Sequence, residues 1–168
     1  PTRRSSDLEI WCKVFNEQKE AYKVMYDKVE RERIMSVLRP SNDVKITQRI
    51  KEKMGFDLTI PSGFFISKDE PDFMWIRKEL EKNSFGIFIY TTPYKDTVQL
   101  EMSSLVSLRD RLMQKYVPGP AEGSFMTTEK EFVPPMVNYI SNYPTGFAAE
   151  MRGMWCLVGD YMAGPFIS

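Results

Sequence analysis

Histidine is absent from this 168-residue sequence. Its absence excludes, within the chain, a serine–histidine–acid triad, a cysteine–histidine pair and every metal site with imidazole ligands. Any catalysis would therefore depend on carboxylates, lysine, tyrosine, serine or a bound cofactor. Cysteine is almost absent as well, since Cys12 and Cys156 are too few for a disulfide scaffold or a four-thiolate metal site. We predict no metal site and no cofactor, and we expect each cysteine to be buried or half-buried.

The sequence also lacks a net charge and a long apolar run. Lysine and arginine together number 23, as do aspartate and glutamate, so no overall field attracts nucleic acid or an anionic membrane. No stretch approaches the roughly 18 to 20 consecutive apolar residues that a membrane-spanning helix needs. The composition is instead globular, 42% hydrophobic and 13% aromatic, which is enough to build a core. We expect no nucleic-acid partner.

The chain divides into three segments by pattern. Residues 1–8 resemble the translation of a common sequencing adapter, and we expect them to be non-native. Residues 9–55 have the apolar spacing of helices, whereas residues 56–168 predict an antiparallel sheet with one long helix over 96–116. The last apolar run, residues 161–168, stops without a turn or a polar terminus. We therefore expect the sheet to be incomplete at the C-terminus.

Three helices are predicted. In the first, over residues 11–38, apolar residues recur on one side at 100° per residue. The second begins after the capping cluster at 41–43 and ends at Gly55, which suits a left-handed C-cap. The third begins at Asp96 or Thr97, with a glutamine in position for a capping box.

Strands are predicted wherever apolar residues alternate between turn residues. The expected segments are 56–60, 64–67, 73–79, 85–92, 124–128, 146–158 and 161–168, and residues 121–142 are otherwise expected to be loop. Gly159 and Asp160 form a turn too short for a parallel crossover. The sequence thus predicts an α+β fold, a mainly antiparallel sheet with about three helices packed on one face.

Carboxylates near the last turn are the catalytic candidates. Glu150 and Arg152 share one face of the predicted strand, and Asp160 lies in the adjoining turn. A glycosidase-like acid and base would need carboxyl groups roughly 5 to 10 Å apart in a cleft. An ion pair between Glu150 and Arg152 on a solvated sheet face is the favoured alternative.

Three further residues are candidates for binding a ligand. Trp155 and Tyr161 would line a partly exposed aromatic groove, although core packing is the favoured interpretation of the aromatic residues of the last third. Arg109 falls within the apolar stripe of the third helix. Its stem either packs on the core while the guanidinium stays in water, or the whole side chain is buried beside a carboxylate.

Several blocks of sequence, taken together and in order, resemble those of a known family. The blocks are Ile60–Gly63, Phe73–Arg77, Ile87–Tyr90, the pair Arg109 and Asp110, Val117–Thr128 and Ala149–Ser168. They resemble a family of Bacteroidota envelope lipoproteins of unknown function, domain-of-unknown-function family 4837. The resemblance is close from Leu58 to the C-terminus and looser over 9–54.

The resemblance implies a location in the cell envelope, facing the periplasm or on the outer membrane. It also implies a signal peptide and a lipidated cysteine upstream, so that a lipid anchor outside this sequence would be the only membrane attachment. It supplies no catalytic residue. We expect a non-catalytic envelope protein that binds a ligand or an envelope protein, or that has a structural role. The alternative is a carboxylate-dependent hydrolase acting on an envelope or dietary polymer.

Overall fold

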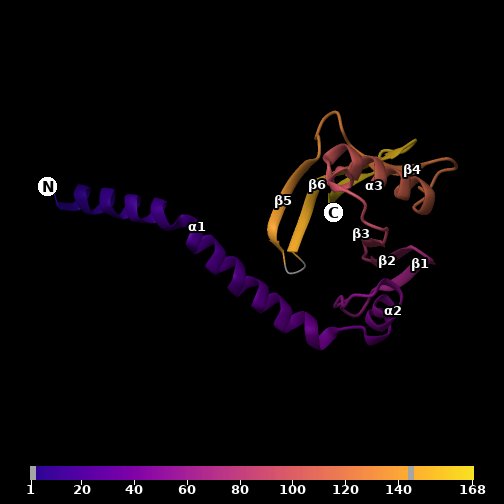
Figure 1. The fold of residues 1–168 in the computed structure, drawn as a ribbon, viewed down its shortest axis with the longest axis horizontal. Helices are drawn as coiled ribbons and strands as arrows, with labels where there is room; N and C mark the ends of the chain where they lie inside the picture. Colours follow the sequence, from indigo (N-terminus) through magenta and orange to yellow (C-terminus); the bar gives the residue numbers. More distant parts are fainter. Residues whose placement is uncertain (1–2, 144–145) are drawn as a thin grey trace. The chain divides into compact units, whose positions relative to one another are not determined.

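The computed structural model describes residues 3–143 and 146–168 (Figure 1). The chain divides into two compact units, residues 1–91 and 92–168, which are described separately below. The described residues form three α-helices and two antiparallel sheets, one sheet in each unit. This confirms the predicted α+β fold, although the strands are divided between two sheets.

α1 (Arg3–Leu38) is a single helix of 36 residues, longer than predicted at its N-terminal end (Figure 1). It ends where a short 3₁₀ turn, η1 (Arg39–Ser41), places Pro40. The sequence predicted an apolar side, but no residue between 7 and 38 is buried. Cys12 is exposed, contrary to expectation, because it lies on this helix.

α2 (Val44–Met54) has the two predicted caps. The Asp43 carboxylate accepts hydrogen bonds of 3.1 Å from the backbone N–H groups of Lys45 and Ile46. At the other end Gly55 has φ +79°, a left-handed conformation that other residues adopt at a cost. These caps fix the register of the helix, so that Ile46 and Ile50 point to the same side and are buried.

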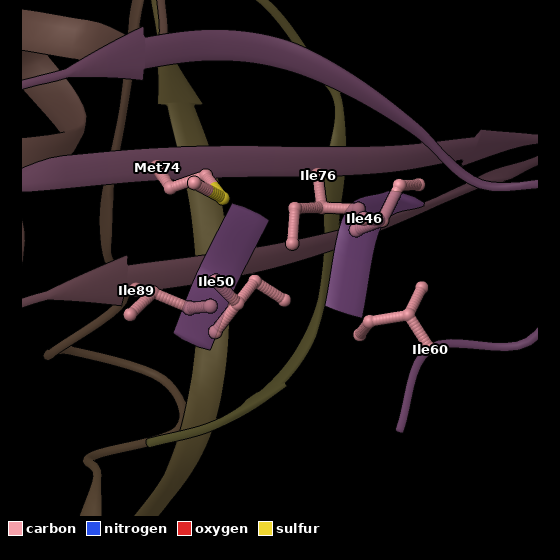
Figure 2. Packing of buried hydrophobic residues seen from close by; sticks show 6 residues of the cluster. All are labelled: Ile46, Ile50, Ile60, Met74, Ile76 and Ile89. Atoms are coloured by element: carbon pink, nitrogen blue, oxygen red, sulfur yellow. The ribbon is translucent and has the colours of Figure 1, made fainter. Parts of the chain in front are cut away.

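The first sheet consists of β1 (Phe65–Glu70), β2 (Phe73–Glu79) and β3 (Ser84–Tyr90), in that order. Residues directly opposite on β2 and β3 share a face, and α2 packs against one face of this sheet. Figure 2 shows the resulting core, which consists of Ile46, Ile50, Ile60, Met74, Ile76 and Ile89.

Residues 56–60 do not form the predicted strand. They alternate as a strand would, but their backbone groups bond to the segment before α2. The Ile60 carbonyl accepts from the Asp43 N–H at 2.7 Å, and the Ile60 N–H donates to the Asn42 side chain at 3.1 Å. With Ile60 only 1% exposed, the alternation reflects burial against α2 and not pairing in a sheet.

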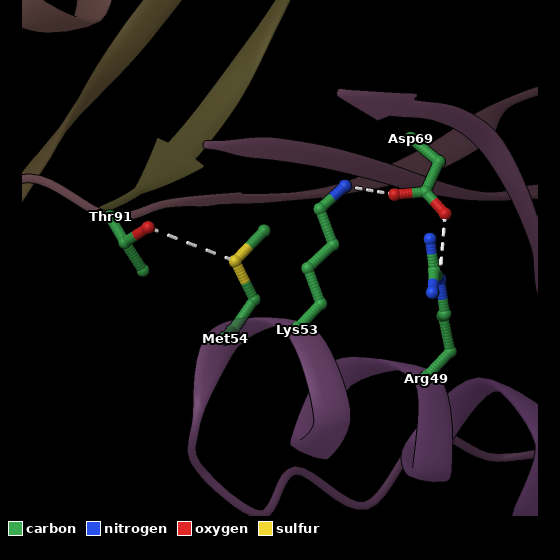
Figure 3. A network of polar contacts seen from close by, with 5 residues as sticks. All are labelled: Arg49, Lys53, Met54, Asp69 and Thr91. Carbon is green, nitrogen blue, oxygen red and sulfur yellow. Dashed lines mark hydrogen bonds and ion pairs between the residues drawn. The ribbon is translucent and has the colours of Figure 1, made fainter. Parts of the chain in front are cut away.

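A polar network joins α2 to β1 beside this core (Figure 3). Arg49 donates from Nε to Asp69 Oδ2 at 2.8 Å, and Lys53 binds the other oxygen of the same carboxylate. Burial by itself would raise the pKa of Asp69, but the hydrogen bonds from Lys53 and then Arg49 outweigh it and lower that pKa below its usual 3.8. Asp69 therefore stabilises the first unit in its ionised form.

Asp69→Asn is expected to lower the free energy of unfolding of the first unit by about 1 kcal/mol at pH 7, a modest value because the site is partly solvated. Since folding lowers the pKa, the stabilisation is complete above about pH 5 and is lost as pH falls through the lowered pKa. Urea denaturation followed by hydrogen exchange of β2 should show the wild-type advantage shrinking below pH 4. Asp57→Asn is the control, because Asp57 forms an ion pair with Lys51 while its own side chain is 72% exposed. Equal losses of unfolding free energy in the two variants would contradict the prediction.

In the second unit, the predicted helix over 96–116 is divided in two. A 3₁₀ turn, η2 (Thr97–Leu100), carries the predicted capping box between Asp96 and Gln99. Glu101 is then extended, and α3 (Met102–Tyr116) begins after it. Its buried side comprises Val106, Arg109, Met113 and Tyr116.

The second sheet is built around β6 (Gly146–Val158), whose bounds match the prediction. Its partners are β4 (Phe125–Thr128), β5 (Met136–Tyr143) and β7 (Ala163–Ile167). Trp155 pairs with both β4 and β7, while Arg152 pairs with both β5 and β7. Because a strand has two edges, β7 occupies one edge and β4 and β5 follow each other along the opposite edge.

β5 lies where a loop was predicted. Pro134 and Pro135, immediately before it, suggested irregular structure over 121–142 outside the predicted strand 124–128. The strand begins directly after them, at Met136, which pairs with Arg152. The prolines therefore belong to the connection from β4, where their missing N–H groups cost no ladder hydrogen bond.

Candidate functional site

α3 lies against one face of the second sheet, and Arg109 makes the central polar contact. Its Nη1 donates to the Thr128 hydroxyl at 3.0 Å, and its Nη2 contacts the Met126 sulfur at 3.6 Å, both on β4. Its guanidinium carbon lies 4.0 Å from the centre of the Phe166 ring on β7. One side chain thus joins α3 to strands on both edges of β6.

Arg109 is buried, with 9% of the residue exposed, so the guanidinium does not reach into water. Burial lowers its pKa to about 10, and the nearby Asp110 opposes that shift. Asp110 Oδ1 lies 3.8 Å from Arg109 Nη1, which is too far for a hydrogen bond. The same oxygen accepts a hydrogen bond of 2.7 Å from the Thr128 N–H. The near contacts of Arg109 are thus a hydroxyl, a sulfur and an aromatic ring, which hold α3 in place and leave little of the charge for a ligand.

Asp110 forms its close ion pair with Lys130 and not with Arg109. Lys130 Nζ lies 2.7 Å from Asp110 Oδ2. Burial would raise the pKa of Asp110, but hydrogen bonds from Lys130 and Thr128 lower it below 3.8. Arg109 and Asp110, one of the sequence blocks that resemble the family, therefore join α3 to β4.

The catalytic candidates are not brought together. Arg152 Nε donates to Glu150 Oε1 at 2.7 Å, which is the predicted ion pair on a sheet face. Asp160 lies in the turn after β6 and accepts from the Tyr161 N–H at 2.6 Å. Between Glu150 and the end of β6 at Val158 the strand advances by roughly 26 Å. Glycosidases place their two carboxyl groups less than about 10 Å apart, so these two cannot serve as such a pair.

The two aromatic candidates are also separated. Trp155 is half-buried on the face that α3 covers, since its cross-strand partner Thr128 bonds Arg109. Its ring lies against Gly164, where an added Cβ would be 2.8 Å from the indole nitrogen. Tyr161 is 96% exposed in the turn.

Sequence reasoning missed two exposed apolar surfaces. One is the face of the second sheet opposite α3, where Met136 and Ile167 flank Arg152 in one cross-strand row and are 72% and 68% exposed. Recognising β5 as a strand would have placed Met136 on this face. The other surface lies on α1.

The second exposed apolar surface lies along one side of α1. A hollow of about 300 Å³ runs along one side of the helix and is lined by Trp11, Val14, Phe15, Tyr22, Met25 and Tyr26, which we call the α1 stripe. Trp11 stacks on Phe15 with ring centres 5.2 Å apart, and Phe15 stacks on Tyr22 at 6.0 Å. Trp11 is nevertheless 61% exposed, and Met25 51%. Sequence spacing could have located this stripe, but not its exposure.

Within 3–143 and 146–168, no helix is both long enough and apolar enough to cross a bilayer. In the same part of the chain, no three acidic or cysteine side chains are grouped so that they could hold a metal ion.

Comparison with known protein families identifies the domain-of-unknown-function family to which the sequence blocks are similar. The model of a family described as a domain of unknown function, DUF4837, matches residues 43–168. The chain belongs to this family. No curated protein and no solved structure matches it. The DUF4837 match begins at Asp43, the N-cap of α2, and covers both sheets, whereas α1 precedes it.

Proposed function

We propose that this DUF4837 chain is part of a cell-envelope protein that binds another protein through the α1 stripe and catalyses no reaction. The observation that carries the proposal is the exposed row of large apolar side chains along one side of α1. Contiguous apolar patches of this kind mark interaction sites in soluble proteins. Trp and Tyr, which are prominent in the stripe, supply a large share of binding energy at interfaces.

The lack of stabilising contacts along α1 supports the same proposal. Helices in proteins are stabilised mainly by packing of an apolar face, and no residue of α1 from 7 to 38 is buried. Its sequence is rich in aromatic and β-branched residues, which form helices less readily than alanine or leucine. A partner that covers the stripe would supply the packing that α1 otherwise lacks.

The envelope location rests on the likeness of the sequence blocks to Bacteroidota lipoproteins. Fractionation of a Bacteroidota cell that carries the tagged full-length gene is expected to recover the protein with the membranes. Recovery in the cytosol would contradict this part of the proposal. The proposed lack of catalysis is supported by the separation of Glu150 from Asp160.

Photo-crosslinking in such cells tests binding through the stripe. Benzoylphenylalanine in place of Phe15 is expected to give a crosslinked protein product, because Phe15 lies within the stripe. The control places the probe at Glu20, on the opposite side of the helix. Products of equal yield from both positions, or none from either, would contradict the proposal.

Met25→Asp should abolish that product without unfolding the chain. Because Met25 is exposed and α1 has no buried residue from 7 to 38, the variant is expected to change the free energy of unfolding of each unit by less than about 0.5 kcal/mol. Urea denaturation measures this change. A loss of 2 kcal/mol or more would mean that the stripe packs within the chain and is not a binding surface.

A further inference from the structure

We infer that the partner of the α1 stripe is an amphipathic helix of another protein, whose apolar seam is bordered by acidic side chains. This inference rests on the proposed function and specifies its partner. It is drawn from the spacing of the stripe and from the charges beside it.

Four residues of the stripe, together with Gln18 and Val29, have the spacing of a coiled-coil seam. Intervals alternate strictly between four and three residues through Trp11, Phe15, Gln18, Tyr22, Met25 and Val29. These are successive d and a positions of a heptad repeat, and they extend over about 27 Å of helix. Such a seam is complementary to a second helix of similar length, because each side chain inserts between residues of the facing helix.

Gln18 is the one polar side chain in this seam. Its Oε1 accepts a hydrogen bond of 2.7 Å from the Tyr22 hydroxyl. Its amide N–H groups are available to a polar residue of a facing helix, and a single amide in a seam fixes register. We therefore expect the partner to carry a polar residue opposite Gln18.

The positions that border the seam carry charge of one sign. At the e and g positions the charged residues are Lys19, Lys28 and Arg33, and all are basic. Lys19 and Lys28 are exposed, and neither has an ion-pair partner among the residues that the structure describes. Arg33 is paired with Glu30 within the helix at 2.5 Å. Acidic side chains on a facing helix would complement this border.

The same charges disfavour two other occupants. A second copy could not offer an acidic e or g residue to these basic residues in any register, and an in-register parallel pair would place Lys28 opposite Arg33. A membrane-surface helix carries lysine and arginine on its polar side. Here that side, the b, c and f positions over 9–38, has five acidic and three basic residues.

Two synthetic helical peptides test the inference against the 168-residue chain. Both have leucine and isoleucine at a and d over three heptads and asparagine opposite Gln18. One has glutamate at e and g, and the other has lysine there. Fluorescence anisotropy is expected to show the glutamate peptide binding at least about tenfold more tightly, with the difference shrinking in high salt. Trp11→Ala should weaken its binding roughly 30-fold.

Charge reversal provides the sharpest comparison. Lys19→Glu combined with Lys28→Glu should reverse the preference, so that the lysine peptide binds more tightly. The matched control is Lys13→Glu combined with Lys23→Glu, which makes the same change at f and b positions. The control should keep the original preference. Circular dichroism of each variant verifies that the helix content is retained.

Each of the following outcomes would overturn the inference. They are equal binding of the two peptides, sedimentation of the chain alone as a dimer that Trp11→Ala dissociates, and binding to vesicles of anionic phospholipid that Trp11→Ala abolishes. Absence of binding by either peptide would overturn it as well. A crosslinked protein product at position 15 would in each case leave the proposed function standing, so the two failures can be distinguished.

Discussion

Arg109→Ala is expected to lower the free energy of unfolding of the second unit by about 3 kcal/mol. The substitution leaves a cavity between α3 and β4 and removes the cation from the face of Phe166. It also leaves the buried Thr128 hydroxyl without its donor at 3.0 Å. Urea denaturation followed by hydrogen exchange of β4 and β6 measures the loss.

Arg109→Met separates the role of the side-chain volume from that of the charge. Burial disfavours the guanidinium, as its lowered pKa of about 10 indicates, so an apolar side chain of similar length recovers much of the stability. We expect Arg109→Met to be about 1.5 kcal/mol more stable than Arg109→Ala. Arg111→Ala, at an exposed position of the same helix, should cost less than about 0.5 kcal/mol. A loss below 1 kcal/mol for Arg109→Ala would show that the side chain lies in water.

Ile50→Ala should destabilise the first unit by a similar amount, about 3 kcal/mol. Ile50 is fully buried where α2 packs on the first sheet, and truncating it removes three methylene-sized groups and leaves a cavity among Met74, Ile76 and Ile89. Hydrogen exchange of β2 and β3 in urea measures the effect.

Val44→Ala is the matched control in the same helix. Val44 is the first residue of α2 and is 68% exposed, so its truncation should change stability by less than about 0.5 kcal/mol. Equal effects at the two positions would mean that α2 does not pack on the sheet through the Ile46 and Ile50 side.

The sequence predicted most of what depends on local chemistry. Asp43 and Gly55 bound α2 because capping needs only neighbouring backbone groups. The bounds of β6 followed from strict alternation, and Gly159 marks the turn after it. The predictions were wrong where residues distant in the sequence determine the structure of a segment. Ile60 bonds to the segment before α2, and Met136 joins a strand 16 residues further along.

The candidate site was less predictable for the same reason. The position of Arg109 in an apolar stripe was visible, but its burial depends on Phe166, 57 residues later in the chain. Glu150 and Arg152 were correctly expected to pair, because residues two apart on a strand share a face. The apolar spacing over residues 11–38 indicated one side of a helix, yet spacing alone does not say whether anything covers that side.

The arrangement of β4 and β5 along one edge of β6 affects how the second sheet accommodates change. The Glu129 N–H still donates to the Met154 carbonyl of β6 at 2.8 Å, so the chain leaves the ladder over residues 130–135 and returns at Met136, opposite Arg152. Both strands keep their partners whatever the length of this excursion, because β6 runs unbroken beneath it. Insertions after Lys130 are therefore tolerated at little more than the entropy of a longer loop, provided that Lys130 keeps its ion pair with Asp110.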